Sequence, residues 1–61
     1  MPLVTIKAKE GRAIEQKRAL VKDITEAVVK NFKVQPEAVI IDIVDYIGEN
    51  IAKAGKLAID S

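Results

Sequence analysis

Two residues near the start of the chain, Pro2 and Arg12, are the ones whose chemistry could support catalysis. If Met1 is removed, the Pro2 nitrogen becomes a secondary amine, and α-amino groups titrate at about 8 in unstructured peptides. Burial in an apolar pocket, or a nearby cation such as Arg12, would lower that pKa further. A pKa close to neutrality suits a general base that must also return its proton. Pro2 is therefore the candidate base, and the planar guanidinium of Arg12 is a candidate carboxylate anchor.

Both residues also have a purely structural interpretation. A proline at the second position can begin an edge strand, where its missing N–H group is harmless. While Met1 is in place, the Pro2 nitrogen is an amide and cannot act as a base. Arg12 follows a glycine before a helical pattern, and an arginine at such a turn can simply be solvated. The residue types alone leave these alternatives open.

The composition excludes several common kinds of active site. The chain has no histidine and no cysteine, and its only serine is Ser61, which excludes Ser-His-Asp and Cys-His arrangements and the common zinc sites. Its three glycines are scattered, so there is no phosphate-binding loop. We expect no metal and no cofactor. Acid–base chemistry is left to carboxylates, lysines, Tyr46 or the amino terminus.

The charge pattern argues against nucleic-acid and membrane partners. Ten Lys and Arg residues against nine Asp and Glu residues give a formal charge of +1, with the signs interspersed. No apolar run approaches the ~20 residues of a membrane span. The first residues lack the basic and apolar regions of a signal peptide. We expect a cytoplasmic protein that binds neither nucleic acid nor membranes.

The hydrophobic pattern predicts one β-α-β unit. Residues 2–8 alternate with period two, which predicts a strand, and residues 38–44 are apolar and β-branched, which predicts a covered or parallel strand. Between them a helix is expected from about Ala13 or Ile14 to about Phe32, ended by the segment around Pro36. Its apolar stripe contains Leu20, Val21, Ile24, Ala27, Val28 and Phe32. The two strands should be parallel with a right-handed crossover.

The rest of the chain predicts a small hairpin and self-association. Residues 45–57 contain two glycines about seven positions apart, which fits a turn followed by a hairpin or lid. The 61 residues form one domain of the α+β class, and hydrophobic residues make up 49% of it. A two-stranded sheet covered on one face is not stable alone. We therefore expect oligomerisation to complete the fold.

The order of several landmarks resembles the small tautomerase family typified by 4-oxalocrotonate tautomerase. The match runs along the whole chain, and its landmarks are Met1-Pro2-Leu3-Val4 with Lys7, Glu10-Gly11-Arg12, Glu15-Gln16-Lys17, Pro36-Glu37-Ala38-Val39, Glu49-Asn50 and Ala54-Gly55. Each landmark is weak by itself, but together, in this order and at these spacings, they are fairly specific.

The resemblance implies both an assembly and a reaction. It implies β-α-β subunits paired into dimers, with three dimers forming a hexamer. It also implies that the terminal proline, here Pro2, moves a proton between oxygen and carbon of an enol or dienol acid and so forms the ketone. Arg12 would then bind a carboxylate of this small-molecule substrate.

Two positions depart from the family pattern. An ungapped alignment places Ile40 where the family has a second substrate-binding arginine, and Ile51 where it has a pocket-wall aromatic residue. Ile40 and Ile51 are therefore the expected substrate-binding positions beside Arg12, but the loss of an arginine removes a charge-assisted contact worth about 1.5–3 kcal/mol. This argues against a dicarboxylate substrate and favours a smaller or less charged enol acid.

The sequence thus predicts a homo-oligomeric isomerase, with two alternatives. One is an oligomeric homologue that is weakly active or non-catalytic, and the other is a decarboxylase or hydratase of the same superfamily. The remaining charged residues are expected to be structural: Asp42 paired or at an oligomer rim, and lysines such as Lys53 and Lys56 on the surface.

Overall fold

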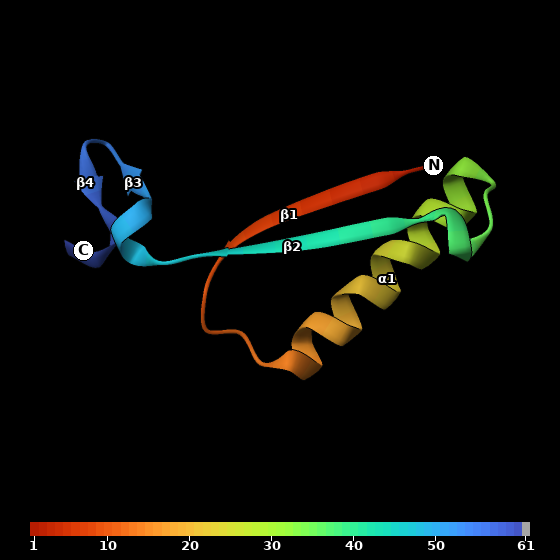
Figure 1. The fold of residues 1–61 in the computed structure, drawn as a ribbon, viewed down its shortest axis with the longest axis horizontal. Helices are drawn as coiled ribbons and strands as arrows, with labels where there is room; N and C mark the ends of the chain where they lie inside the picture. The colour runs from red at the N-terminus through yellow and green to blue at the C-terminus, as the bar shows by residue number, and fades with distance from the viewer. Residues whose placement is uncertain (61) are drawn as a thin grey trace.

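A computed structural model describes residues 1–60, and Ser61 lies outside them. The chain forms β1 (Leu3–Lys9), α1 (Ile14–Phe32), β2 (Ile40–Tyr46), β3 (Ala52–Lys53) and β4 (Lys56–Leu57), with short 3₁₀ turns at Pro36–Ala38, at Gly48–Asn50 and, after β4, at Ala58–Asp60. Figure 1 shows α1 beside the β1–β2 sheet and the β3–β4 hairpin beyond the end of the sheet that is far from the N-terminus. The predicted β-α-β unit with a C-terminal hairpin is confirmed.

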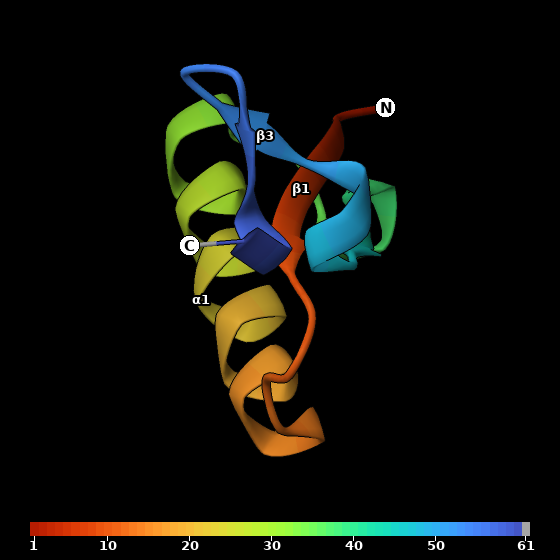
Figure 2. The ribbon, with the colours of Figure 1, turned by 90° about the vertical axis from the view of Figure 1, so that its left-hand side faces the viewer.

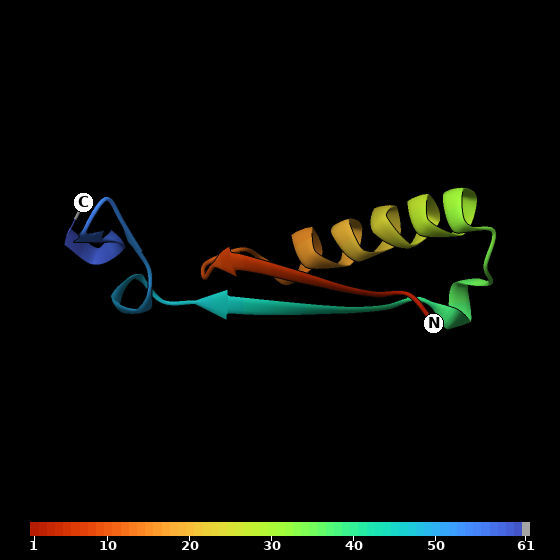
Figure 3. The same ribbon diagram turned by 90° about the horizontal axis from the view of Figure 1, so that it is seen from above.

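The sheet has one covered face and one open face. β1 and β2 are parallel, with Leu3 opposite Ile40 and Lys9 opposite Tyr46. The side chains that alternate toward α1 are half-buried, as Val4, Ile6, Ile41 and Ile43 show. Figure 3 shows α1 on one side of the two strands only. The side chains of the other side are exposed, and we call them the open sheet face: Leu3, Thr5, Lys7, Ile40, Asp42 and Val44.

Local hydrogen bonds explain where α1 begins and ends. Gly11 has a φ of 112°, which reverses the chain after β1. The Gln16 side chain then accepts a hydrogen bond from the Ala13 N–H at 2.9 Å, so it satisfies a donor that the helix start leaves unpaired. At the other end Lys33 is left-handed, and its N–H donates to the Val29 carbonyl at 3.0 Å. The predicted helix and its predicted boundaries are confirmed.

The predicted start of β2 is wrong, and the apolar stripe of α1 is only partly covered. Ala38 lies in a 3₁₀ turn that begins at Pro36, so β2 starts two residues later than expected, at Ile40. In the predicted stripe of α1, Val21, Ile24 and Val28 are half-buried, but Leu20, Ala27 and Phe32 are exposed. A sheet of two strands is too narrow to cover the full width of the stripe, and α1, at about 28 Å, is longer than a seven-residue strand of about 23 Å.

The chain buries little of its apolar surface. Among residues 1–60, no side chain is fully buried, and Leu3 and Phe32 are each 67% exposed. The radius of gyration is 14.7 Å, with extents of 43 × 23 × 13 Å, whereas a compact chain of this length would have a radius of about 10.5 Å. A fold this extended has room for partner chains on its apolar surface, and self-association stays a prediction. Within the same residues, no helix is both long and apolar enough to span a bilayer.

Two polar contacts tie the elements together. Thr5 and Asp42 are opposite each other across the sheet, and the Thr5 hydroxyl donates to the Asp42 carboxylate at 2.7 Å, so Asp42 is paired as expected. The Lys17 ammonium on α1 lies 2.6 Å from the carboxylate of Asp45 on β2, with side chains 27% and 37% exposed. The second contact joins the helix to the strand that it covers.

We expect Asp45→Asn to lower the free energy of unfolding by about 0.2–1 kcal/mol, because the variant loses a partly exposed ion pair. The loss should shrink in 1 M NaCl, which screens the pair. Urea unfolding at one fixed protein concentration measures both values. Asp23→Asn is the matched control, since Asp23 is exposed on α1 and has no cation within 4 Å in residues 1–60. A salt-independent loss for Asp45→Asn would contradict this account.

Candidate functional site

Pro2 and Ile40 lie together at the N-terminal end of the sheet. The Ile40 N–H donates to the Pro2 carbonyl at 3.0 Å, which makes Pro2 the point where the parallel pairing begins. Pro2 is half-buried, while Met1 before it is 88% exposed. The Ile40 side chain is 43% exposed on the open sheet face. The hydrogen bond to its carbonyl thus holds Pro2 in place, and its nitrogen lies just before the start of β1.

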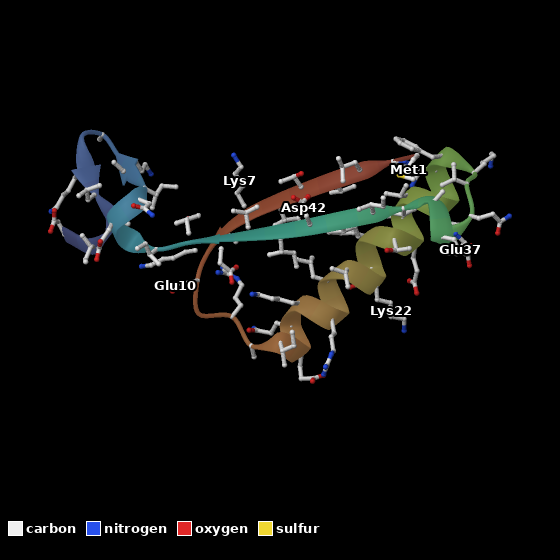
Figure 4. The ribbon with its side chains drawn as sticks, in the orientation of Figure 1. Met1, Lys7, Glu10, Lys22, Glu37 and Asp42 are labelled. Carbon is white, nitrogen blue, oxygen red and sulfur yellow. The ribbon has the colours of Figure 1, made fainter. Side chains whose placement is uncertain are left out.

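Arg12 lies past the opposite end of the same strand. Seven residues of β1 separate the two positions, a length of roughly 23 Å, and Figure 4 shows Met1 and Glu10 at opposite ends of the sheet. One guanidinium nitrogen of Arg12 donates to the Lys9 carbonyl at 2.8 Å, which holds the exposed side chain against the turn. Its other N–H groups have no acceptor in the described part of the chain, so they can bind a carboxylate from outside.

Ile51 lies farther along in the same direction, beside the hairpin. It lines a hollow of about 350 Å³ together with neighbours from β2, β3, β4 and the last 3₁₀ turn, namely Tyr46, Ala52, Lys53, Lys56 and Ala58. Figure 2, which views the molecule from this end, shows the hairpin in front of the sheet and α1. Ile51 is 37% exposed, so an aliphatic wall of this hollow is accessible.

One chain therefore does not assemble the four residues that the sequence singles out. Pro2 and Ile40 are at one end of the sheet, and Arg12 and Ile51 come after the strand ends at the other. Within a single chain the Arg12 cation is too distant to act on the Pro2 nitrogen, because charges this far apart are screened in water. Any site that uses all four must draw them from more than one copy.

Other parts of the chain offer little competing chemistry. A second hollow, between α1 and the Pro36 turn, is lined by Val21, Lys22, Thr25, Glu26, Val29 and Pro36 and contains none of the predicted site residues. Nowhere in residues 1–60 do three or more carboxylate side chains gather in a way that could hold a metal ion.

Lys53 and Lys56 are the residues whose position the sequence analysis missed. Both are exposed, as expected of surface charges, and in addition they are direct cross-strand partners that line the Ile51 hollow. A signal was present in the sequence: only Ala54-Gly55 separates them, and a two-residue hairpin turn places its flanking residues opposite each other.

Comparison with known proteins identifies the family to which the sequence is similar. A sequence profile of the tautomerase family, described as tautomerase enzyme, matches residues 2–58. The chain is 43% identical over 56 residues to a probable tautomerase of Halalkalibacterium halodurans, covering 92% of both chains. It is also 43% identical over 56 residues to the 2-hydroxymuconate tautomerase of Bacillus subtilis, covering 92% of this chain and 90% of the relative.

A solved structure extends the likeness to three dimensions. The crystal structure of YwhB, a homologue of 4-oxalocrotonate tautomerase, superposes with a TM-score of 0.94 at 40% identity and covers 98% of both chains. The parallel β-α-β unit, the hairpin that follows it and the sequence match over nearly the full length all agree. The chain belongs to the tautomerase family.

Proposed function

We propose that this chain is a tautomerase that converts an enol or dienol acid into the corresponding ketone, with Pro2 as base and then acid. The observation that carries the proposal is the place of Pro2, at the start of the first strand of a tautomerase-family chain, with its carbonyl fixed by Ile40 and its ring half-buried. The relative named 2-hydroxymuconate tautomerase supports an enol acid as the kind of substrate.

The reaction requires only a proton transfer. Once Met1 is removed, the Pro2 nitrogen takes the proton of the enol hydroxyl, the C–O bond becomes a carbonyl, and the carbon–carbon double bond shifts. The protonated amine then returns the proton to carbon, so the amine is regenerated. No electrons are gained or lost overall, and the reaction needs no cofactor. A ring nitrogen with a fixed direction suits both transfers, because it must reach oxygen and carbon of the same bound molecule.

Arg12 is the proposed carboxylate anchor, and it must come from another copy of the chain. Arg12 is exposed and donates only to the Lys9 carbonyl among residues 1–60, and a guanidinium binds a carboxylate through two parallel hydrogen bonds. Since about 23 Å of strand separates it from Pro2 in one chain, the complete site forms where the Pro2 end of one subunit meets the Arg12 end of another. The open sheet face, with Leu3 67% exposed and Val44 44% exposed, is apolar surface for such assembly. The hexamer typical of this family is the assembly that we propose.

The catalytic role of Pro2 predicts a specific pair of results. The intact mass should be lower than that of the full sequence by one methionine, because only a cleaved chain has an amine at Pro2. Pro2→Ala should reduce kcat/KM at least ~100-fold, the lower range of what a positioned acid–base group contributes. The assay follows the loss of the enol absorbance of 2-hydroxymuconate and of phenylenolpyruvate.

Pro36→Ala is the matched control, since Pro36 is the only other proline and lies in the turn before β2. It should keep nearly full activity. Equal rates for wild type and Pro2→Ala would sink the assignment to Pro2 and favour a scaffold without this reaction. Activity in a chain that retains Met1 would do the same.

The shared site predicts complementation between two inactive variants. Pro2→Ala and Arg12→Ala should each have low activity alone. Unfolded together and refolded as a mixture, they should regain part of the wild-type activity, because some sites then combine an intact Pro2 with an intact Arg12 from different chains. Mixing the two variants after separate refolding provides the control for subunit exchange. If the co-refolded mixture is no more active than either parent, the two residues do not act from different chains.

A further inference from the structure

The β3–β4 hairpin brings two ammonium groups together on one face. Lys53 and Lys56 are cross-strand partners on either side of the two-residue turn Ala54-Gly55, whose φ angles are 52° and 78°. Directly opposed residues of an antiparallel pair project their side chains to the same face, with Cβ atoms about 4.5–5.5 Å apart. The turn therefore fixes the two lysines as neighbours.

Two apolar residues, Ile51 and Ala58, lie on the same face of the hairpin as the lysines and farther from the turn. The Ala58 N–H donates to the Ile51 carbonyl at 2.9 Å, so the hairpin pairing continues one step past the strands. Because alternate residues share a face, Ile51 and Ala58 lie on the same side as Lys53 and Lys56, and all four line the 350 Å³ hollow with Tyr46. The hollow, which Ala52 also lines, is thus bordered by apolar side chains, by Tyr46 and by the two lysines.

Within residues 1–60, neither of the paired cations has an ion-pair partner. Like charges directly opposite in an antiparallel pair are destabilising. Throughout residues 1–60, the ion pairs are Lys17–Asp45 and Arg18–Glu15, and neither hairpin lysine donates a side-chain hydrogen bond. An anion bound between the two ammonium groups would replace a repulsion by two attractions. The arrangement of charge therefore favours an anionic ligand.

We propose that Lys53 and Lys56 form an anion site that binds a carboxylate of the substrate, with the hydrocarbon part of the substrate against Ile51 and Tyr46. This proposal rests on the proposed function, because it assumes that the Ile51 hollow belongs to the active site. It also specifies the substrate class. Ile40 supplies no cation where the family pattern has an arginine, and the hairpin provides two cations from another side. The preferred substrate is then an enol acid with a second carboxylate remote from the enol carbon, which reverses the expectation of a less charged substrate that was drawn from Ile40.

Steady-state kinetics of Lys53→Gln/Lys56→Gln test this preference. For 2-hydroxymuconate, which has two carboxylates, KM should rise about tenfold or more while kcat stays within about twofold. For phenylenolpyruvate, which has one carboxylate, KM should change less than about threefold. Lys53→Arg/Lys56→Arg keeps both charges and should keep the wild-type KM values, which also shows that substitution itself does not disrupt the hairpin.

Lys22→Gln/Lys30→Gln is the matched control for net charge, since it removes two exposed lysines from α1. It should leave both KM values within about twofold of wild type. An equal rise of KM for both substrates, or the same rise in the control, would overturn the proposal, because either result indicates a general effect of charge.

Binding of cis,cis-muconate separates this proposal from the proposed function. This dicarboxylate has no enol group, so its calorimetric Kd reports the anion site even if the protein has no tautomerase activity. We expect the Kd to rise about tenfold or more in Lys53→Gln/Lys56→Gln and to be unchanged in Lys22→Gln/Lys30→Gln. Unaltered muconate binding in the hairpin variant overturns the proposal. If Lys53→Gln/Lys56→Gln binds muconate as the wild type does but has a different number of subunits, the proposal is also overturned. In that case the two lysines pair with a carboxylate of a neighbouring chain.

Discussion

Parallel pairing of β1 with β2 is the constraint on which the rest of the structure depends. A parallel pair places both strand beginnings at one end of the sheet, so Pro2 and Ile40 meet there through a backbone hydrogen bond of 3.0 Å. The same pairing carries the chain away from Pro2 along the whole of β1 before Gly11 allows it to turn. Arg12 and the hairpin are consequently at the far end. The parallel pairing thus separates the proposed base, Pro2, from the proposed anchor, Arg12. The proposed reaction therefore requires more than one subunit.

The elements that depend on near neighbours in sequence were predictable. Alternation from Pro2 to Ala8 indicated β1, and the side chains do alternate between half-buried and exposed. The expected start of α1 is confirmed, and there the Gln16 side chain accepts a hydrogen bond from the Ala13 N–H. These features follow from contacts within a few residues, which a single sequence records directly. The start of β2 was misplaced because Ala38, apolar like its successors, is drawn into the turn that Pro36 initiates.

Features that depend on the width and ends of the sheet were not predictable from periodicity. Phe32 belongs to the apolar stripe of α1 by spacing, yet it lies at the end of the helix and is 67% exposed. The pairing of Lys53 with Lys56 was overlooked for a different reason, because a lysine is ordinarily a solvated surface charge and only the exact turn length places two of them opposite each other. The catalytic assignment of Pro2 depends on the removal of Met1, a covalent event that neither residue spacing nor backbone geometry records.

The contact between Thr5 and Asp42 has a consequence for the fate of newly made subunits. This carboxylate lies among the aliphatic side chains of the open sheet face and uses one of its oxygens on Thr5 at 2.7 Å. A foreign aliphatic surface that covered it would strip water from an ionised group and offer no hydrogen-bond donor in return, which costs several kcal/mol. Asp42 therefore disfavours the binding of unrelated apolar surfaces to the open sheet face. A charge at this position acts as a gatekeeper residue, which opposes aggregation of the monomer before it assembles with other subunits.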